Sequence, residues 1–272
     1  MSPISRRSFI KGAIAVGITP LALNADVIKK SQGLKFIHVT DSHFDLQNEY
    51  SVQSLKTMVL FINEHYKDLD FVLFGGDNYN HTKDVHEAHK FKKIVSQLNV
   101  PFYAVRGNKE ASQKEFNELF VDGMGLKTND RDWLLEKNGY MILGLDSSTE
   151  GASNGSYDDE TIKFAQSILE KEKPTIILNH HPYTNYWGGT EKKDIHKYVL
   201  NNTNEVQEKL FKYPNLLLTL SGHKHIDSSS EINGTKVIAT RALMSPRDLK
   251  SFPMRYVKID GKKVHEKLVY TV

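Results

Sequence analysis

The sequence of 272 residues contains no cysteine. This absence excludes a disulfide-bonded scaffold, a lipid-anchored cysteine and thiolate ligands for a metal ion. The chain also lacks internal repeats, low-complexity tracts and any linker rich in proline, glycine and serine. With 39% hydrophobic and 25% charged residues, its composition is that of an ordinary globular protein. The sequence therefore predicts one large domain whose site chemistry depends on oxygen and nitrogen groups.

The sequence also has no apolar run long enough to span a bilayer comfortably. Near the N-terminus, "SRRSFIK" leads into the modest apolar stretch "GAIAVGITPLAL", and a charged start before such a stretch is typical of an export signal. The pair Arg6 and Arg7 resembles a twin-arginine signal. This resemblance implies passage through the twin-arginine translocase in the folded state. We predict a signal peptide over residues 1–25, a domain over 26–272, and a location in the periplasm or at the extracytoplasmic face. An uncleaved anchor or a basic helix is the alternative.

Without the predicted signal peptide, the chain has no excess of basic or acidic residues. The whole sequence has 36 basic and 33 acidic residues. The predicted signal holds Arg6, Arg7 and Lys11 and no acidic residue, so its removal leaves 33 basic against 33 acidic residues. A surface that binds nucleic acid is typical of a clear basic excess. The composition therefore predicts no nucleic-acid partner, and the apolar pattern predicts no stable membrane span.

What the sequence does contain, from residue 34 onward, is an alternation of strand and helix patterns. Short apolar, β-branched runs predict strands, and apolar residues at helical spacing predict helices. In the first half the predicted order is strand 34–40, helix 51–66, strand 71–77, helix 83–98 and strand 101–108. This order indicates parallel strands covered by helices.

The second half predicts a mixed arrangement. Hairpin turns are indicated at three Asn-Gly or Asp-Gly pairs, namely Asn138-Gly139, Asn233-Gly234 and Asp260-Gly261. Between the turns lie a helix over 159–172, strands over 174–180 and 215–223, and helices within 191–213. The predicted fold class is therefore α/β, with two packed mixed sheets flanked by helices.

Polar side chains follow five of these strands directly. They are Asp41, His43, Asp77, Asn108, His180, His223 and His225. Because the carboxyl ends of parallel strands meet at one edge of a sheet, we expect these side chains to converge. One such motif alone is typical of a turn or a cap, but five in succession favour a site for two metal ions sharing a carboxylate. Carboxylate, amide and imidazole groups without thiolate favour Mn, Fe or Zn.

The same motifs, in the same order, resemble the calcineurin-like metallophosphoesterase superfamily. Its pattern is D-x-H, G-D, G-N-H-D/E, a single His and G-H-x-H, and the resemblance covers residues 34 to about 245. It implies an αββα sandwich of two mixed sheets. It also implies that Asp41, His43 and His225 bind one metal, that Asn108, His180 and His223 bind the second, and that Asp77 bridges them.

The resemblance implies a phosphoester hydrolase. Two adjacent metals would bridge a water, lower its pKa, and deliver a hydroxide for in-line attack on phosphorus. The D-x-H opening is similar to the cyclic-nucleotide and glycerophosphodiester phosphodiesterases, so a small phosphodiester is the expected substrate. Purple acid phosphatases have a G-D-x-x-Y ligand, whereas the matching position here is Asn80, so that branch is rejected. The alternatives are a phosphomonoesterase, a nucleotide pyrophosphohydrolase, and an inactive metal-binding recognition domain.

Lys109 is a departure from the family pattern, because most relatives have a histidine there. A lysine beside two dications would lose its proton more readily than a free lysine, or it would act as a fixed positive charge on a phosphate oxygen. We predict catalytic roles for Lys109, Asn108 and Asp77. Lys109 would suit a substrate with a good leaving group, or one whose ester needs charge stabilisation more than an acid. The alternative is a solvent-facing lysine paired with Glu110.

Four further residues are weaker candidates for binding substrate. His181, Tyr183 and Trp187 belong to the segment "HHPYTNYWGG" just after the predicted ligand His180. Its glycines and aromatic residues are typical of a loop that shapes a pocket, and core packing is the alternative. Arg241 follows the strand pattern "KVIAT" and would reach a substrate phosphate, or form a surface ion pair.

Overall fold

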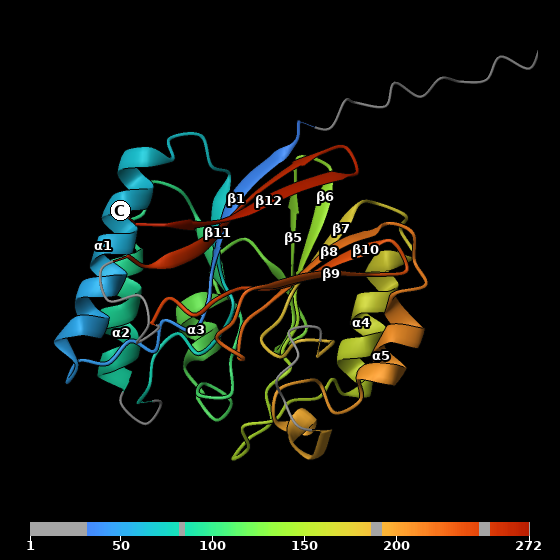
Figure 1. Ribbon diagram of the computed structural model, residues 1–272, viewed down its shortest axis with the longest axis horizontal. Helices are drawn as coiled ribbons and strands as arrows, with labels where there is room; N and C mark the ends of the chain where they lie inside the picture. Colours follow the sequence, from blue (N-terminus) through green and yellow to red (C-terminus); the bar gives the residue numbers. More distant parts are fainter. Residues whose placement is uncertain (1–31, 82–84, 186–191, 245–250, 272) are drawn as a thin grey trace, which may run out of the picture. The chain divides into compact units, whose positions relative to one another are not determined.

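The computed structural model describes residues 32–81, 85–185, 192–244 and 251–271 (Figure 1). The predicted signal peptide over residues 1–25 and the candidate Trp187 lie outside the described residues. Within the described part of the chain, no helix combines the length and the apolar character that crossing a membrane requires.

The first sheet has five strands in the order β12-β11-β1-β2-β3. Its parallel strands are β1 (Leu34–Val39), β2 (Phe71–Phe74) and β3 (Phe102–Ala104). The hairpin of β11 (Pro253–Asp260) and β12 (Lys263–Tyr270) extends this sheet antiparallel to β1. The helices α1 (Glu49–His65) and α2 (Val85–Val95) lie together at the outer side of this sheet (Figure 1).

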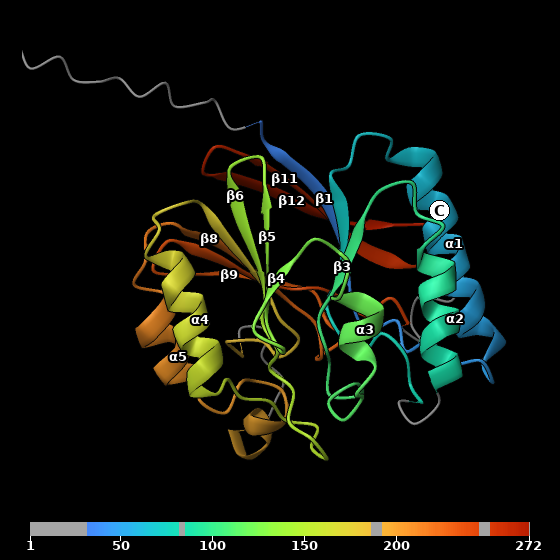
Figure 2. The ribbon, with the colours of Figure 1, turned by 180° about the vertical axis from the view of Figure 1, so that it is seen from behind.

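The second sheet has seven strands in the order β4-β5-β6-β7-β8-β10-β9. In chain order these are β4 (Lys127–Thr128), β5 (Trp133–Lys137), β6 (Tyr140–Gly144), β7 (Thr175–Leu178), β8 (Leu216–Ser221), β9 (Ser228–Ile232) and β10 (Thr235–Ala239). The strands β6, β7, β8 and β10 are parallel, and the outer strands are antiparallel. The helices α4 (Asp159–Leu169) and α5 (Thr203–Leu210) cover the outer side of this sheet (Figure 2).

The central strands of the second sheet contribute to two hydrophobic cores. Ile142 of β6 and Ile176 of β7 belong to the large core between the sheets, together with Phe36 of β1. The next residues along the chain, Leu143 and Ile177, belong to the smaller core under α4 and α5. Successive side chains of a strand point to opposite faces, so each of these strands has to be apolar on both sides. This is why the sequence shows continuous apolar runs there.

This architecture confirms the predicted fold class of two mixed sheets flanked by helices. The three hairpin turns occur where Asn138-Gly139, Asn233-Gly234 and Asp260-Gly261 predicted them. The region 191–213 differs in part, because a 3₁₀ helix, η1 (Lys192–Lys197), precedes α5. A short helix, α3 (Phe116–Phe120), and the strand β4 were not predicted.

Candidate metal centre

The predicted ligands lie in loops that leave the carboxyl ends of β1, β2, β3, β7 and β8. The first two loops are joined by backbone hydrogen bonds beyond the strands themselves: the Asp41 N–H donates to Gly76 O at 3.0 Å, and the His43 N–H to Asp77 O at 3.0 Å. The loop after β10 also joins them, because the Leu243 N–H donates to Thr40 O at 2.9 Å. The folding of the sheets thus brings residues far apart in the sequence to one place.

The first group of side chains is Asp41, His43 and His225. His225 Nε2 lies 3.2 Å from Asp41 Oδ1 and 3.1 Å from His43 Nε2. Asp41 is fully buried, and its Oδ2 accepts hydrogen bonds from Thr40 Oγ1 at 2.8 Å and from the His223 N–H at 2.9 Å. Burial favours the neutral acid, but the neighbouring His225 imidazole outweighs it and lowers the pKa of Asp41. The Asp41 carboxylate in turn raises the pKa of His225 against the effect of burial.

The second group is His180, His223 and Asn108. His180 Nε2 lies 3.1 Å from His223 Nδ1 and 3.3 Å from Asn108 Oδ1. Asp77 lies between the two groups, because its Oδ1 is 3.5 Å from His180 Nε2 and its Oδ2 is 3.9 Å from His43 Nε2. All seven side chains that the sequence singled out are therefore brought together, with one carboxylate facing both groups.

The hydrogen bonds of two histidines show that this donor set fits a cation. His180 Nδ1 lies 2.8 Å from Gly75 O, and His223 Nε2 lies 2.7 Å from Lys197 O. A carbonyl oxygen only accepts, so these two nitrogens carry the ring protons in the neutral tautomers. The remaining nitrogens, His180 Nε2 and His223 Nδ1, then face each other at 3.1 Å with lone pairs and no proton between them. Burial lowers the pKa of His223 to about 4, so near neutral pH an ion, and not a proton, suits this gap.

The backbone of the ligand loops is strained where the ligands lie. Five of the seven residues have a positive φ: Asp41 (51°), His43 (42°), Asp77 (48°), His223 (64°) and His225 (60°). A left-handed conformation costs a residue with a side chain about 1–3 kcal/mol, and it is typical of functional sites. The rest of the fold, and any ion bound there, must offset this cost.

Two glycines allow the ligand loops to approach each other closely. A Cβ atom on Gly107 would lie 2.2 Å from both the backbone nitrogen and Oδ1 of Asp77. A Cβ atom on Gly222 would lie 1.9 Å from Thr40 Oγ1 and 2.3 Å from Asp41 Oδ2. No side chain fits at either position, which explains why the G-N and G-H-x-H motifs begin with glycine.

Glu110 is a residue of the site that the sequence reasoning missed. It is fully buried, and its Oε1 accepts the N–H groups of Asn78 at 2.8 Å and Tyr79 at 3.1 Å. Its Oε2 accepts the N–H groups of Gly107 at 2.8 Å and Asp77 at 3.1 Å. Burial and the Asp77 carboxylate raise the pKa of Glu110, and the backbone donors act against this rise. One carboxyl group thereby fixes the loop that carries Asp77 to the loop that carries Asn108.

This position of Glu110 also corrects one interpretation of Lys109. The alternative in which Lys109 pairs with Glu110 in solvent is wrong, because the Glu110 carboxyl group is buried among backbone N–H groups. Lys109 is exposed, and its own N–H donates to Asp77 Oδ1 at 2.9 Å. Its backbone is therefore attached to the carboxylate that faces both groups.

The other candidate substrate residues are placed differently. His181 is fully buried, with Nδ1 2.8 Å from Ser147 Oγ, and its ring centroid lies 4.4 Å from that of His223. Tyr183 is also buried, and its hydroxyl lies 2.6 Å from that of Tyr157. These buried positions correct the expectation of direct substrate contact: His181 packs on the candidate ligand His223, and Tyr183 is a core residue. Arg241 is partly exposed just after β10, and its contact with substrate stays a prediction.

Comparison with known proteins agrees with this geometry. Residues 34–227 match the family model described as calcineurin-like phosphoesterase. A probable glycerophosphodiester phosphodiesterase, GpdQ, of Arcobacter nitrofigilis is 27% identical over 215 residues, which is 76% of each chain. The 3',5'-cyclic adenosine monophosphate phosphodiesterase CpdA of Haemophilus influenzae is 25% identical, over 77% of this chain and 76% of its own.

The fold is similar to those of two solved phosphatases. A dimetal phosphatase from Danio rerio has a TM-score of 0.63 and 13% identity, with 88% of this chain and 99% of that chain covered. A purple acid phosphatase from yellow lupin has a TM-score of 0.64 and 12% identity, with 89% and 52% covered. The chain belongs to the calcineurin-like phosphoesterase family. It is thus a phosphoric ester hydrolase of the dimetal type, with histidine and aspartate clusters that can hold the metal ions.

Proposed function

We propose that this protein is a dinuclear metal-dependent phosphodiesterase. Asp41, His43 and His225 would hold one ion, and the second would be held by Asn108, His180 and His223, with Asp77 shared between them. The observation that carries this proposal is the pair of bare nitrogens, His180 Nε2 and His223 Nδ1, facing each other at 3.1 Å. Carboxylate, amide and imidazole ligands suit Mn, Fe or Zn.

The chain's own residues would hold the ions and the substrate in a fixed relation. Two ions bound there would supply an activated water and positive charge on the phosphate oxygens. Glu110 holds the Asp77 and Asn108 loops together through four backbone N–H groups. The His223 ring is oriented by Lys197 O and by packing against His181. Such fixed loops keep the ligands oriented before substrate arrives.

Lys109 would add a positive charge at the edge of this centre. Its backbone N–H is anchored on Asp77 Oδ1 at 2.9 Å, and its side chain is exposed. We infer that the ammonium group contacts a phosphate oxygen or the leaving oxygen. Lys109→Ala should then slow an alkyl phosphodiester and an aryl phosphodiester by different factors, because the aryl leaving group needs less help. Equal rates of wild type and variant on both esters would contradict this role.

A phosphodiester is the favoured substrate for two reasons. The D-x-H opening at Asp41 and His43 resembles that of the phosphodiesterase branch of the family, and the similar proteins GpdQ and CpdA carry the names of phosphodiesterases. A phosphomonoesterase, a nucleotide pyrophosphohydrolase and an inactive metal-binding domain are the competing outcomes of the test.

The test compares two chromogenic esters on the full-length chain loaded with Mn, Fe or Zn. We expect bis-(p-nitrophenyl) phosphate to be hydrolysed faster than p-nitrophenyl phosphate, and Asp77→Asn to abolish both activities. Glu64→Gln, at an exposed position of α1, is the matched control with unchanged rates. Bound metal without turnover of any phosphoester would overturn the enzyme assignment, and faster monoester hydrolysis would overturn the diester preference.

We further propose export to the periplasm through the twin-arginine translocase. The support is the sequence "SRRSFIK" followed by an apolar stretch. Replacing Arg6 and Arg7 by lysine should retain the protein in the cytoplasm, because this translocase recognises the arginine pair. Cell fractionation with an antibody to the folded domain measures this, and an unchanged periplasmic fraction in the double variant would refute it.

A further inference from the structure

Asn80 contacts the ring of the candidate ligand His43 from outside the ligand group. His43 Nδ1 lies 2.9 Å from Asn80 Oδ1. The other ring nitrogen, Nε2, lies 3.1 Å from His225 Nε2, 3.9 Å from Asp77 Oδ2 and 4.0 Å from Asp41 Oδ1. One nitrogen of the ring is therefore bound by Asn80, and the other faces the remaining members of the group.

Two contacts on opposite sides place the proton of the neutral His43 ring on Nδ1. The Asn80 amide oxygen only accepts hydrogen bonds, so His43 Nδ1 is the donor. On the other side, His225 Nε2 lies 3.2 Å from the Asp41 carboxylate, which also only accepts, so His225 Nε2 carries a proton that an ion would displace. His43 Nε2, which faces it at 3.1 Å, then accepts through a lone pair. That lone pair is what a metal ion requires of this ring.

The two ligand groups differ in what orients their histidines. In the second group, the ring protons of His180 and His223 are held by backbone carbonyl oxygens at 2.8 Å and 2.7 Å, and no side-chain substitution removes a carbonyl group. In the first group, the acceptor for His43 belongs to a side chain. A substitution of Asn80 would therefore remove the acceptor of the first group and leave those of the second group in place.

The backbone around Asn80 is held independently of its side chain. The Asn80 N–H donates to Phe44 O at 2.9 Å. The next residue, His81, donates its N–H to Glu87 Oε2 at 2.6 Å, and Glu87 is only 1% exposed. These bonds fix the loop after β2 to the loop after β1 and to α2. The Asn80 amide thus has a defined position, and its replacement should leave the loop folded.

We propose that Asn80 is a positioning residue of the first metal site and acts through His43. The inference rests on the dinuclear centre proposed above and adds a residue to it. The amide oxygen keeps the ring proton on Nδ1 and thereby keeps Nε2 available to an ion. Partners of this kind fix the tautomer and the orientation of a ligand histidine, and their loss costs about tenfold to hundredfold in metal affinity. The position that matches the tyrosine ligand of the G-D-x-x-Y pattern thus supports a ligand here.

The first test is calorimetric titration of Zn into the full-length chain after treatment with a chelator. Wild type should bind two ions. Asn80→Leu, which is similar in size but has no acceptor, should weaken one of the two by about tenfold to hundredfold and leave the other unchanged. Asn80→Asp keeps an oxygen acceptor and should bind both ions as wild type does. Asn204→Leu, at an exposed position of α5, is the matched control and should also bind both.

The selectivity of the loss decides between positioning and general damage. Two ions of wild-type affinity in Asn80→Leu would overturn the inference. An equal weakening of both ions would also overturn it, because the structure places the Asn80 amide at the first group alone among the ligand contacts described above. A loss in Asn80→Asp as large as that in Asn80→Leu would show that an acceptor at this position is not what matters.

Nitrogen-15 NMR of the histidine side chains adds a readout that depends on neither metal nor activity. The spectra are recorded on the chelator-treated chain at pH 8.5, above the ordinary imidazole pKa of about 6.5, and the His43 signals are assigned by their loss in His43→Gln. Wild type and Asn80→Asp should show the Nδ1-protonated tautomer. Asn80→Leu should shift the population toward the Nε2-protonated form, and an unchanged tautomer there would contradict the proposal.

Turnover of bis-(p-nitrophenyl) phosphate separates this inference from the function on which it rests. If Asn80→Leu loses one ion selectively but no variant, wild type included, hydrolyses a phosphoester, the positioning role stands and the phosphodiesterase fails. If wild type hydrolyses the diester and Asn80→Leu binds both ions normally, the inference fails and the phosphodiesterase stands. If both are correct, the activity of Asn80→Leu should recover as Zn is raised, whereas Asp77→Asn should stay inactive.

Discussion

Glu110 shows how one buried carboxyl group positions two loops. In the sequence it follows Lys109 directly, so its charge suggested a surface pair. Nothing local indicates that its carboxyl group turns inward, because its four donors come from Gly107 and from residues 77–79, about thirty positions earlier. Contacts of this range depend on the packing of β2 beside β3. They become visible only once the sheet is formed.

Glu110→Gln is expected to weaken metal binding more than its size suggests. Glutamine has nearly the same shape, but its amide nitrogen would replace a carboxyl oxygen that accepts backbone N–H groups. Those N–H groups would then face another donor and lose their hydrogen bonds. Loss of a positioning group of this kind costs metal affinity about tenfold to hundredfold, and the unfolding free energy should fall by roughly 2 kcal/mol. Metal titration and urea unfolding measure the two effects. Glu64→Gln should show neither, and an unchanged affinity in Glu110→Gln would refute the role.

His38 makes the folding stability of the chain depend on pH. It is fully buried, with Nδ1 2.9 Å from Thr240 Oγ1, and burial together with Arg255 lowers its pKa to about 3. The unfolded chain binds the proton below a pKa of about 6.5. The unfolded state therefore holds more protons between these values, and stability is lost as the pH falls from about 6.5 toward 3.

His38→Asn should remove this contribution while keeping a polar partner for Thr240. The unfolding free energy should then depend less steeply on pH below 6.5. One proton fewer taken up on unfolding lowers the slope by up to about 1.4 kcal/mol per pH unit. Urea unfolding between pH 4.5 and 7 measures the slope. His265→Asn, at an exposed position of β12, should keep the wild-type slope. An equal slope in all three proteins would show that His38 is not the group responsible.

Among the elements, the sequence predicted those strands and helices that are long enough to show a regular apolar pattern. The strands β1, β2, β3, β7 and β8 are apolar and buried, and the polar residues that follow them stand out against these apolar runs. That contrast makes the seven candidate ligands recognisable from the sequence alone. The helix α3 has five residues and β4 has two, and elements this short show no full period of either pattern. They form because neighbouring elements hold them.

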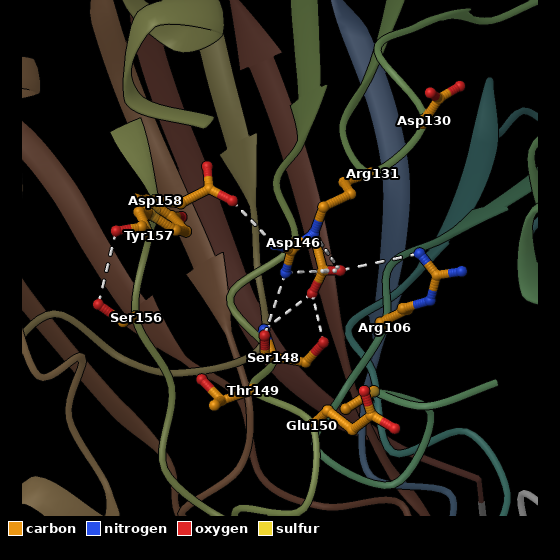
Figure 3. Close-up of a pocket in the computed structure, with 11 residues that line it drawn as sticks. Arg106, Asp130, Arg131, Asp146, Ser148, Thr149, Glu150, Ser156, Tyr157 and Asp158 are labelled. Carbon is orange, nitrogen blue, oxygen red and sulfur yellow. Dashed lines mark hydrogen bonds and ion pairs between the residues drawn. The ribbon is translucent and has the colours of Figure 1, made fainter. Parts of the chain in front are cut away.

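The packing of elements also explains why two predicted substrate residues, His181 and Tyr183, are buried instead. His181 and Tyr183 belong to a loop that looks like a pocket wall in the sequence, but their polar atoms meet Ser147 and Tyr157. These partners come from the segment between β6 and α4, and no motif marks them. A cavity of about 590 Å³ between the loops after β3 and β6 was missed for the same reason, since its wall joins loops that are distant in the chain (Figure 3).

Gly107→Ala tests the close approach of the turns after β2 and β3. The new Cβ would lie 2.2 Å from the Asp77 backbone nitrogen, so the two turns must separate. A displacement near 1 Å at a reacting site costs about a hundredfold in rate, and metal content should fall with it. Gly123→Ala is the control: it has φ +71° but nothing within 4 Å of the new atom. It should cost about 1 kcal/mol of stability and leave activity intact. Equal activity of both variants would contradict the interpretation.

For the whole molecule, the ligand set should make stability depend on metal. An ion that binds only the folded state adds about 2.7 kcal/mol when present at a hundred times its Kd. For a chain of this size we expect the Tm to rise by roughly 5–10 °C on adding Mn or Zn to the metal-free protein. Thermal unfolding followed by circular dichroism measures it. Asp77→Asn should lose most of the shift, and a wild-type Tm indifferent to every metal would contradict the proposed centre.

The two sheets each supply part of both ligand groups, and this has a topological consequence. In the first group, Asp41 and His43 follow a strand of the five-stranded sheet, and His225 follows a strand of the seven-stranded sheet. In the second group, Asn108 follows the five-stranded sheet, and His180 and His223 follow the seven-stranded one. An ion held by the first group would close a loop of the chain from residue 41 to residue 225, and an ion held by the second group would close one from residue 108 to residue 223. A protein without cysteine thus has a place for a reversible cross-link across its central interface, one that a chelator or an acid opens without breaking a covalent bond.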